Sequence, residues 1–410
     1  LQSPVTRRFK TLQTLRSLRY RNFRLLCVGS VLSNTGDFMQ DIAQSWLVWH
    51  LTNSAVLLGV VGFFDTIPRL LFGAIGGAIV DRMDRRRLLI ITQALAMGQA
   101  FVYWFAVYYG FIAFWHVILL TLFLGIVNSI NQTLRQSLVN SLVPKEELLN
   151  AIALHSSMFN LSRILGPSIG GALIAVVGIA GCFFINGLSF LAIIFSVFLM
   201  QLPPWEPPST EAGLWNDIKE GARYVKGSRN ILSVFSLSYI VSLVGAPYSR
   251  FLPVFATNVL HVGALGFGLL TAAPGIGATA SSLVVASLGN IRPDILLIAS
   301  SVLGFALFLA LFAFSHSFVL SLGLLILSGF CLIAFRMLSN TAIQLDTPPV
   351  LLGRVLSFYF MDRGLWSLGG QLIGSSVSLV GVAWAFAGCA CAMAIASSCV
   401  LIWIGRTSRQ

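Results

Sequence analysis

The chain has 410 residues, of which 57% are hydrophobic and 10% are charged, and its formal net charge is +12. Soluble globular proteins average about 45–50% apolar and about 25% charged residues, so this composition excludes an ordinary soluble protein. The positive charge gathers at the start of the chain, where no acidic residue interrupts it. This distribution favours anionic lipid headgroups over nucleic acid as the partner of the charge. The basic residues concerned are Arg7, Arg8, Lys10, Arg16, Arg19, Arg21 and Arg24.

A helix needs about 20 apolar residues to cross the hydrocarbon core of a bilayer. The apolar runs of this sequence predict twelve such helices, and therefore an all-α membrane protein. The expected spans are roughly 22–51, 55–80, 87–110, 114–141, 147–177, 180–201, 229–258, 264–289, 294–314, 317–345, 351–379 and 382–404.

The connections between these spans alternate in charge. The first, third and later odd-numbered connections carry no Lys, Arg, Asp or Glu, whereas the even-numbered connections and both termini hold nearly all the loop charge. Short basic loops stay on the cytoplasmic side of a membrane. The pattern therefore predicts a multi-pass protein with both termini in the cytoplasm.

The sequence also predicts two halves of six spans each. Pro144 and Asn150 follow the fourth span at the same spacing as Pro348 and Arg354 follow the tenth, an offset typical of parallel transporter repeats. An amphipathic helix is expected within the polar stretch that joins the halves. The expected domains are a basic arm (1–21), a first six-helix bundle (22–201), a cytoplasmic linker (202–228), a second six-helix bundle (229–404) and a tail (405–410).

The first span carries polar residues on one helical face, at spacings of four, three, one and three. Two carboxylates one turn apart near the bilayer centre are costly unless they meet water or a partner, and such residues commonly mark transport pathways. Reversible protonation is one interpretation of this face. The alternatives are a solvated cavity wall or a structural pair with a cation. The residues are Ser33, Asp37, Gln40, Asp41 and Gln44.

The fourth, seventh and tenth spans have polar faces of the same kind. A water-filled cavity lined by spans 1, 4, 7 and 10 would explain all four faces. Arg135 and Arg336 lie nearer the cytoplasmic end than Asp37, so lipid phosphate, a gate and substrate all remain open as their partners. The residues are Asn128, Asn131, Gln132 and Arg135; Ser238, Ser242, Gly245 and Ser249; and Arg336, Asn340 and Gln344.

Other charged residues inside the spans have simpler or open interpretations. Asp65 and Arg69 stand one turn apart and are expected to form an internal ion pair. Asp362 and Arg363 are adjacent and point to different faces, and no single role follows for them or for Arg163. The cysteines fall inside spans and the histidines mostly at span edges, without ligand-like spacing, so neither a metal nor a cofactor is expected.

Two motifs resemble the major facilitator superfamily. The loop after the second span resembles that superfamily's signature, although Asp84 stands where many members have glycine. The fifth span is similar to the helix motif of its proton-coupled antiporters. The residues that match are Gly77, Asp81, Arg82, Arg85 and Arg86 in the loop, and Gly166, Pro167, Gly170 and Gly171 in the helix.

Further strings over residues 18–404 resemble a bacterial branch that includes enterobactin-type siderophore exporters and macrolide efflux proteins. Among them are Ser33-Asn34-x-Gly36-Asp37 and Gly353-Arg354-Val355. The resemblance implies two bundles that rock around a central site, proton antiport, and a conformational latch formed by Asp81 and its arginines. Many proton-coupled drug exporters have an arginine early in the fourth helix. This chain departs from them, because no basic residue lies between His116 and Leu134. Asp37 and Asp41 are therefore the candidates for proton coupling.

The expected function is export of a small amphipathic molecule, such as a drug, antibiotic or siderophore, by a monomeric transporter of the bacterial inner membrane. A lipid or lysolipid transporter on the same fold is the alternative. A polytopic membrane enzyme is a remote one, because the sequence contains no His-Glu-x-x-His or Gly-x-Ser-x-Gly string.

Overall fold

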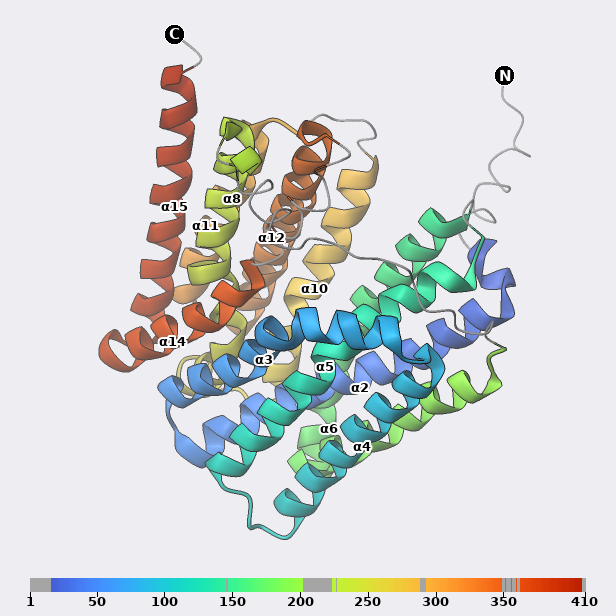
Figure 1. Cartoon of the computed structure of the whole chain (residues 1–410). Helices are drawn as coiled ribbons and strands as arrows, with labels where there is room; N and C mark the ends of the chain where they lie inside the picture. The colour runs from blue at the N-terminus through green and yellow to red at the C-terminus, as the bar shows by residue number, and fades with distance from the viewer. Residues whose placement is uncertain are drawn as a thin grey trace, which may run out of the picture. The chain divides into compact units, whose positions relative to one another are not determined.

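A computed structural model describes residues 16–144, 147–201, 223–225, 227–287, 293–348, 351, 355, 359 and 362–407, all of them helical or in short connections (Figure 1). The chain forms two compact units. One comprises Leu1–Gln44 and Pro68–Ser209, and the other comprises Ser45–Ile67 and Thr210–Gln410. The domain boundaries expected from the sequence stay a prediction. Most of the expected linker helix lies outside the described residues.

The helices follow one another with short connections, as the apolar runs predict. In chain order they are η1 (Arg16–Arg19), α2 (Arg21–Thr52), α3 (Ala55–Arg82), α4 (Arg85–Tyr108), α5 (Phe114–Leu142), α6 (Leu148–Leu199), α8 (Arg229–Ile240), η3 (Val241–Gly245), η4 (Ala246–Phe251), α9 (Leu252–Asn258), α10 (Ala264–Ser287), α11 (Ile295–Ala313), α12 (Phe318–Asp346), α14 (Asp362–Val380) and α15 (Val382–Thr407).

Helix α6 contains two of the expected spans. Its 52 residues include Gly178, which has a φ of 74° that interrupts the helix. At a rise of about 1.5 Å per residue, a straight helix of this length would far exceed a hydrocarbon core of about 30 Å. Gly178 therefore separates the expected fifth and sixth spans, and glycine suits this position because it adopts positive φ without steric cost.

In the described part of the chain, eight helical stretches are long and apolar enough to cross a membrane, and the one at Asn150–Leu199 includes the break at Gly178. The expected seventh span is also a single helical stretch, Arg229–Asn258, although it changes from α-helix to π-helix and 3-10 helix on the way. Helix α2 has 32 residues, which is ample length for a span, and it carries the acidic polar face.

The short helix η1 is tied to the start of α6. Arg16 and Arg19 both lie within ion-pair distance of Glu147, at 2.8 and 3.2 Å, and Ser17 donates a hydrogen bond to Asn150. A hydrogen bond from Arg19 to the hydroxyl of Tyr20 raises the pKa of this guanidinium above its usual value. Part of the basic N-terminal charge thus serves to anchor the chain start.

The segment Ser45–Ile67 packs within the second unit through specific contacts. Trp49 donates its indole hydrogen bond to Thr257 at 2.9 Å, and Trp46 stacks on Phe267 with ring centroids 5.2 Å apart. Asp65 forms an ion pair with Arg250 at 2.9 Å. The side chain of Arg69 lies outside the described set, so its expected pairing with Asp65 stays a prediction.

Helices α10 and α12 cross at very close range in the second unit (Figure 1). A Cβ atom added at Gly277 would overlap the carbonyl oxygen of Ile326, and one added at Gly329 would overlap the carbonyl oxygen of Pro274. Small residues permit this backbone contact between membrane helices, where packing replaces the hydrophobic effect as the driving force.

Gly277→Ala should therefore destabilise the protein, because the methyl group forces the two helices apart. We expect a cost of about 1–3 kcal/mol, the usual range for overpacking, measured as a lower thermal unfolding midpoint in detergent. Gly323→Ala is the matched control, because no atom lies within 4 Å of a Cβ at that position. Equal midpoints for the two variants would contradict the close crossing.

Candidate substrate and proton sites

The first unit holds a polar network centred on Arg135 of α5. Its guanidinium donates hydrogen bonds to Asn34 at 2.7 Å, to Ser33 at 3.3 Å and to Gln93 at 3.2 Å. Asp37, one turn beyond Ser33 on α2, interacts electrostatically with the same guanidinium. The structure thus brings one expected cation of the fourth span against the expected polar face of the first.

Helix α4 completes this network with residues that the sequence reasoning missed. Thr92 and Gln93 donate to the Asn131 side-chain oxygen at 2.6 and 3.3 Å. They were missed because Thr92 and Gln93 are neutral and lie in a mostly apolar span, which carries no acid or base beside them. The spacing of Thr92 and Gln99, seven residues apart on one face, was the available signal.

A second chain of hydrogen bonds crosses the first unit. Asn186 of α6 donates to Gln40 at 2.8 Å, Gln40 donates to Gln99 at 3.1 Å, and Gln99 donates to the carbonyl of Leu120. Gln40 is only 2% exposed and Asn186 is fully buried. Gln44 reaches α5 separately, through Thr121 at 2.9 Å. These amides hold α2, α4, α5 and α6 together.

The remaining candidates of the first unit differ in exposure. Asp37 and Asn128 are half-buried and Asp41 is exposed, whereas Ser33 and Asn131 are buried. The side chain of Gln132 lies outside the described residues. Asp41 is the more exposed of the two acids. Asp37 is the acid whose charge acts on the guanidinium of Arg135.

The glycines of the fifth-span motif position α6 against the acidic stretch of α2. A Cβ at Gly166 would lie 2.8 Å from the carbonyl oxygen of Thr35, and one at Gly170 would lie 2.9 Å from Ile42. Pro167 sits inside the helix and Gly171 is buried. The motif therefore allows α6 to approach the part of α2 that carries Asp37 and Asp41.

The charged connection after α3 is described only in part. Gly77, Asp81 and Arg82 belong to α3, but their side chains lie outside the described set, so the latch stays a prediction. Asp84 caps α4 by accepting a hydrogen bond from the backbone of Arg86 at 2.9 Å, a favourable N-cap. Arg86 donates to the carbonyl of Phe198 near the end of α6, and Arg85 lies half-buried.

The second unit brings the polar faces of three helices together. Ser242 of η3 donates a hydrogen bond to Asp362 of α14 at 2.7 Å. Arg336 of α12 lies over the ring of Trp366 on α14, 5.9 Å from its centroid. Asn340 follows one turn after Arg336, and Gln344 one turn later is exposed. Asp362 and Trp366 were not among the site residues expected from the sequence.

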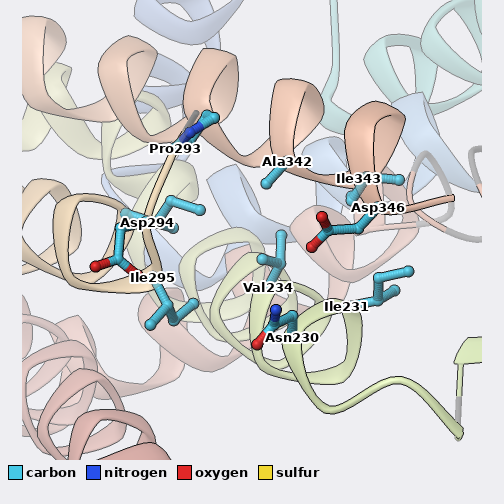
Figure 2. Close-up of a pocket in the computed structure, with 10 residues that line it drawn as sticks. Asn230, Ile231, Val234, Pro293, Asp294, Ile295, Ala342, Ile343 and Asp346 are labelled. Atoms are coloured by element: carbon cyan, nitrogen blue, oxygen red, sulfur yellow. The ribbon is translucent and has the colours of Figure 1, made fainter. Parts of the chain in front are cut away.

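A pocket of about 260 Å³ opens where α8, α11 and α12 begin or end (Figure 2). Asn230, Asp294 and Asp346 contribute its polar lining, with Ile231 and Val234 beside them. None of the expected site residues lines this pocket. The polar networks of the two units are therefore separate from it.

Solved structures of transporters share this architecture. A POT family transporter in complex with 5-aminolevulinic acid superposes with a TM-score of 0.73 at 10% identity, over 93% of this chain and 96% of the other. A bacterial homologue of the human lysosomal transporter Spinster, inward-facing and occupied, gives 0.72 at 13% identity over the same shares. These likenesses establish the fold, which is all-helical in the described part of the chain. With the match of residues 12–405 to a family model, it is the major facilitator fold, whose members have twelve spans.

Sequence comparison identifies the family. Residues 12–405 match the family described as transmembrane secretion effector, and the chain belongs to it. The staphyloferrin A transporter of Staphylococcus aureus (strain NCTC 8325 / PS 47) is 26% identical over 383 residues, covering 90% of this chain and 92% of that protein. The enterobactin exporter EntS of Escherichia coli O1:K1 / APEC is 26% identical over 345 residues, covering 80% and 76%. The resemblance to the siderophore-exporter branch is confirmed, and the protein is a transporter, not an enzyme.

Gln40→Leu should lower the thermal unfolding midpoint, because it leaves the buried amides of Asn186 and Gln99 without their partner. An unsatisfied buried polar group costs about 1–3 kcal/mol. Gln344→Leu is the control, since this glutamine is exposed on α12. An unchanged midpoint for Gln40→Leu would show that the amide chain does not hold the helices together.

Proposed function

We propose that this protein exports a siderophore-like small molecule by alternating access, driven by proton antiport, across a bacterial inner membrane with both termini in the cytoplasm. The observation that carries the proposal is the network around Arg135 and Asp37, which places an acid and a cation inside an apolar helical unit. Such groups are costly in a membrane and mark transport pathways. The two named relatives support siderophores as the substrate class.

Arg135 is the residue best suited to bind an acidic or oxygen-rich substrate. The three side chains that accept hydrogen bonds from it, Asn34, Ser33 and Gln93, are all neutral. A guanidinium recognises carboxylates and other planar oxygen groups through several parallel donors. We therefore propose that the transported molecule carries oxygen groups of this kind.

Asp37 links this site to protons. A proton on its carboxylate would remove the negative charge that acts on Arg135, and so would change the electrostatic state of the whole network. Asp41, exposed one turn along α2, would exchange protons with water. The latch residues Gly77, Asp81, Arg82, Arg85 and Arg86 would then bias the two states of the transporter.

In the second unit, Ser242, Arg336, Asn340 and Gln344 are the proposed counterparts for substrate. All four belong to two helices that contact α14: η3, through the pair Ser242–Asp362, and α12, through the placement of Arg336 over the ring of Trp366. We propose that the protein works as a monomer, because one chain supplies the candidate substrate residues of both units.

Asp37→Asn and Asp41→Asn should each reduce proton-driven transport by about tenfold or more, which corresponds to roughly 1.4 kcal/mol of lost coupling. The measurement is uptake of staphyloferrin A and of enterobactin into inside-out proteoliposomes with an imposed proton gradient. Asp294→Asn, an exposed acid of the second unit, is the matched control.

If the unmodified protein takes up neither compound in response to the gradient, the siderophore proposal is contradicted. Movement of fluorescent phospholipids or lysolipids in the same vesicles would instead favour a lipid transporter. Full activity of both Asn variants would leave export standing and remove these two acids from proton coupling.

A further inference from the structure

Asp362 is a buried acid whose described partners are neutral. Its side chain is 7% exposed, and its carboxylate accepts a hydrogen bond from the hydroxyl of Ser242 at 2.7 Å. Among the described residues, no Lys or Arg side chain forms an ion pair with it. A buried carboxylate is expensive when it is ionised without a cation, whereas the protonated acid is cheap to bury.

The groups around Asp362 come from every helix that packs against α14. Tyr239 of α8 interacts electrostatically with the carboxylate. Arg336 of α12 is placed over Trp366, and Arg250 of η4 pairs with Asp65 of α3. The remaining described titratable groups on these elements are Arg229 of α8, Tyr248 of η4, Cys331 and Asp346 of α12, and Cys389, Cys391 and Cys399 of α15. The side chains of Arg69, Asp81 and Arg82 on α3, of Arg363 on α14 and of Arg406 on α15 lie outside the described residues.

Ser242 lies in a short π-helix, η3, between α8 and the 3-10 helix η4. Pro247 near the start of η4 lacks a backbone N–H, so the regular ladder cannot continue through this point. Single-turn π-helices occur frequently at functional sites. Here the hydroxyl of Ser242, within the π-helix, donates a hydrogen bond of 2.7 Å to the carboxylate of Asp362.

Four buried polar atoms on the helical stretches that carry Ser242, Arg336 and Asp362 have no hydrogen-bond partner in the described part of the chain. They are the hydroxyls of Ser238 and Ser339, the side-chain oxygen of Asn340 and the indole nitrogen of Trp366. Ser238 lies one turn before Ser242, and Trp366 lies one turn after Asp362. Buried polar atoms in proteins are almost always paired with protein, water or ligand, so water at these atoms would complete the set.

We propose that Asp362 is a proton-binding carboxylate of the second unit, reached by water along the polar atoms of Ser238 and Trp366, which lie one helical turn from Ser242 and from Asp362. When a proton binds, the carboxyl gains its own O–H, and the hydroxyl of Ser242 turns from donor to acceptor. The hydroxyl accommodates this reversal by rotating about its C–O bond. The proposal rests on the proton antiport proposed above and adds a coupling group in the half of the chain that lacks Asp37 and Asp41.

The test is infrared difference spectroscopy of the purified full-length protein in lipid nanodiscs on a step between acidic and neutral pH. A buried protonated carboxyl gives a separate C=O band. We expect this band in the unmodified protein and in Asp294→Asn, its absence in Asp362→Asn, and a shifted frequency in Ser242→Ala. A band that persists unchanged in Asp362→Asn would overturn the proposal.

Transport supplies the second readout. Asp362→Asn should lose about tenfold or more of gradient-driven uptake, yet keep substrate exchange without a gradient, because the exchange step needs no net proton movement. Loss of both activities with a normal unfolding midpoint would point to a substrate contact and would overturn the proton role. If the unmodified protein transports neither siderophore, the proposed function fails, and the infrared band still decides whether Asp362 binds a proton.

Discussion

The absence of water from the hydrocarbon core is the constraint on which the rest of the structure depends. Inside it, each polar side chain needs a partner from the protein, and a charge needs more than one. The guanidinium of Arg135 meets this demand with three acceptors from two other helices. Because those acceptors belong to α2 and α4, the same bonds that satisfy one charge also position the acidic face of α2.

Each unit meets the constraint with its own polar contacts. In the first, the amides of Asn186, Gln40 and Gln99 form a continuous chain that ends on a backbone carbonyl. In the second, Ser242 donates to the buried carboxylate of Asp362, and the hydroxyl of Ser238, one turn before Ser242, has no hydrogen-bond partner among the described residues. Fully satisfied networks favour one rigid arrangement, so the amide chain of the first unit is suited to hold its helices together.

Small residues determine how closely the helices that bear these polar groups can pack against one another. Gly166 and Gly170 bring α6 against the acidic stretch of α2, and Gly277 and Gly329 bring α10 against α12. Asp84 stands where many members of the superfamily have glycine, and its carboxylate has a local role because it caps α4. A residue that departs from the superfamily pattern can thus serve the helix that begins there.

The sequence by itself determined the fold class, the helix positions and the family, because long apolar runs and the glycine motifs depend only on local spacing. It also placed Asp37, Arg135, Ser242 and Arg336 on polar faces. It could not show which faces meet: that Arg135 bonds Asn34, that Asp65 pairs with Arg250, or that Asp362 accepts from Ser242. Those pairings join residues roughly one hundred to nearly two hundred positions apart. Only tertiary packing decided them, because a helical period fixes the face of a side chain but not the helix that lies opposite it.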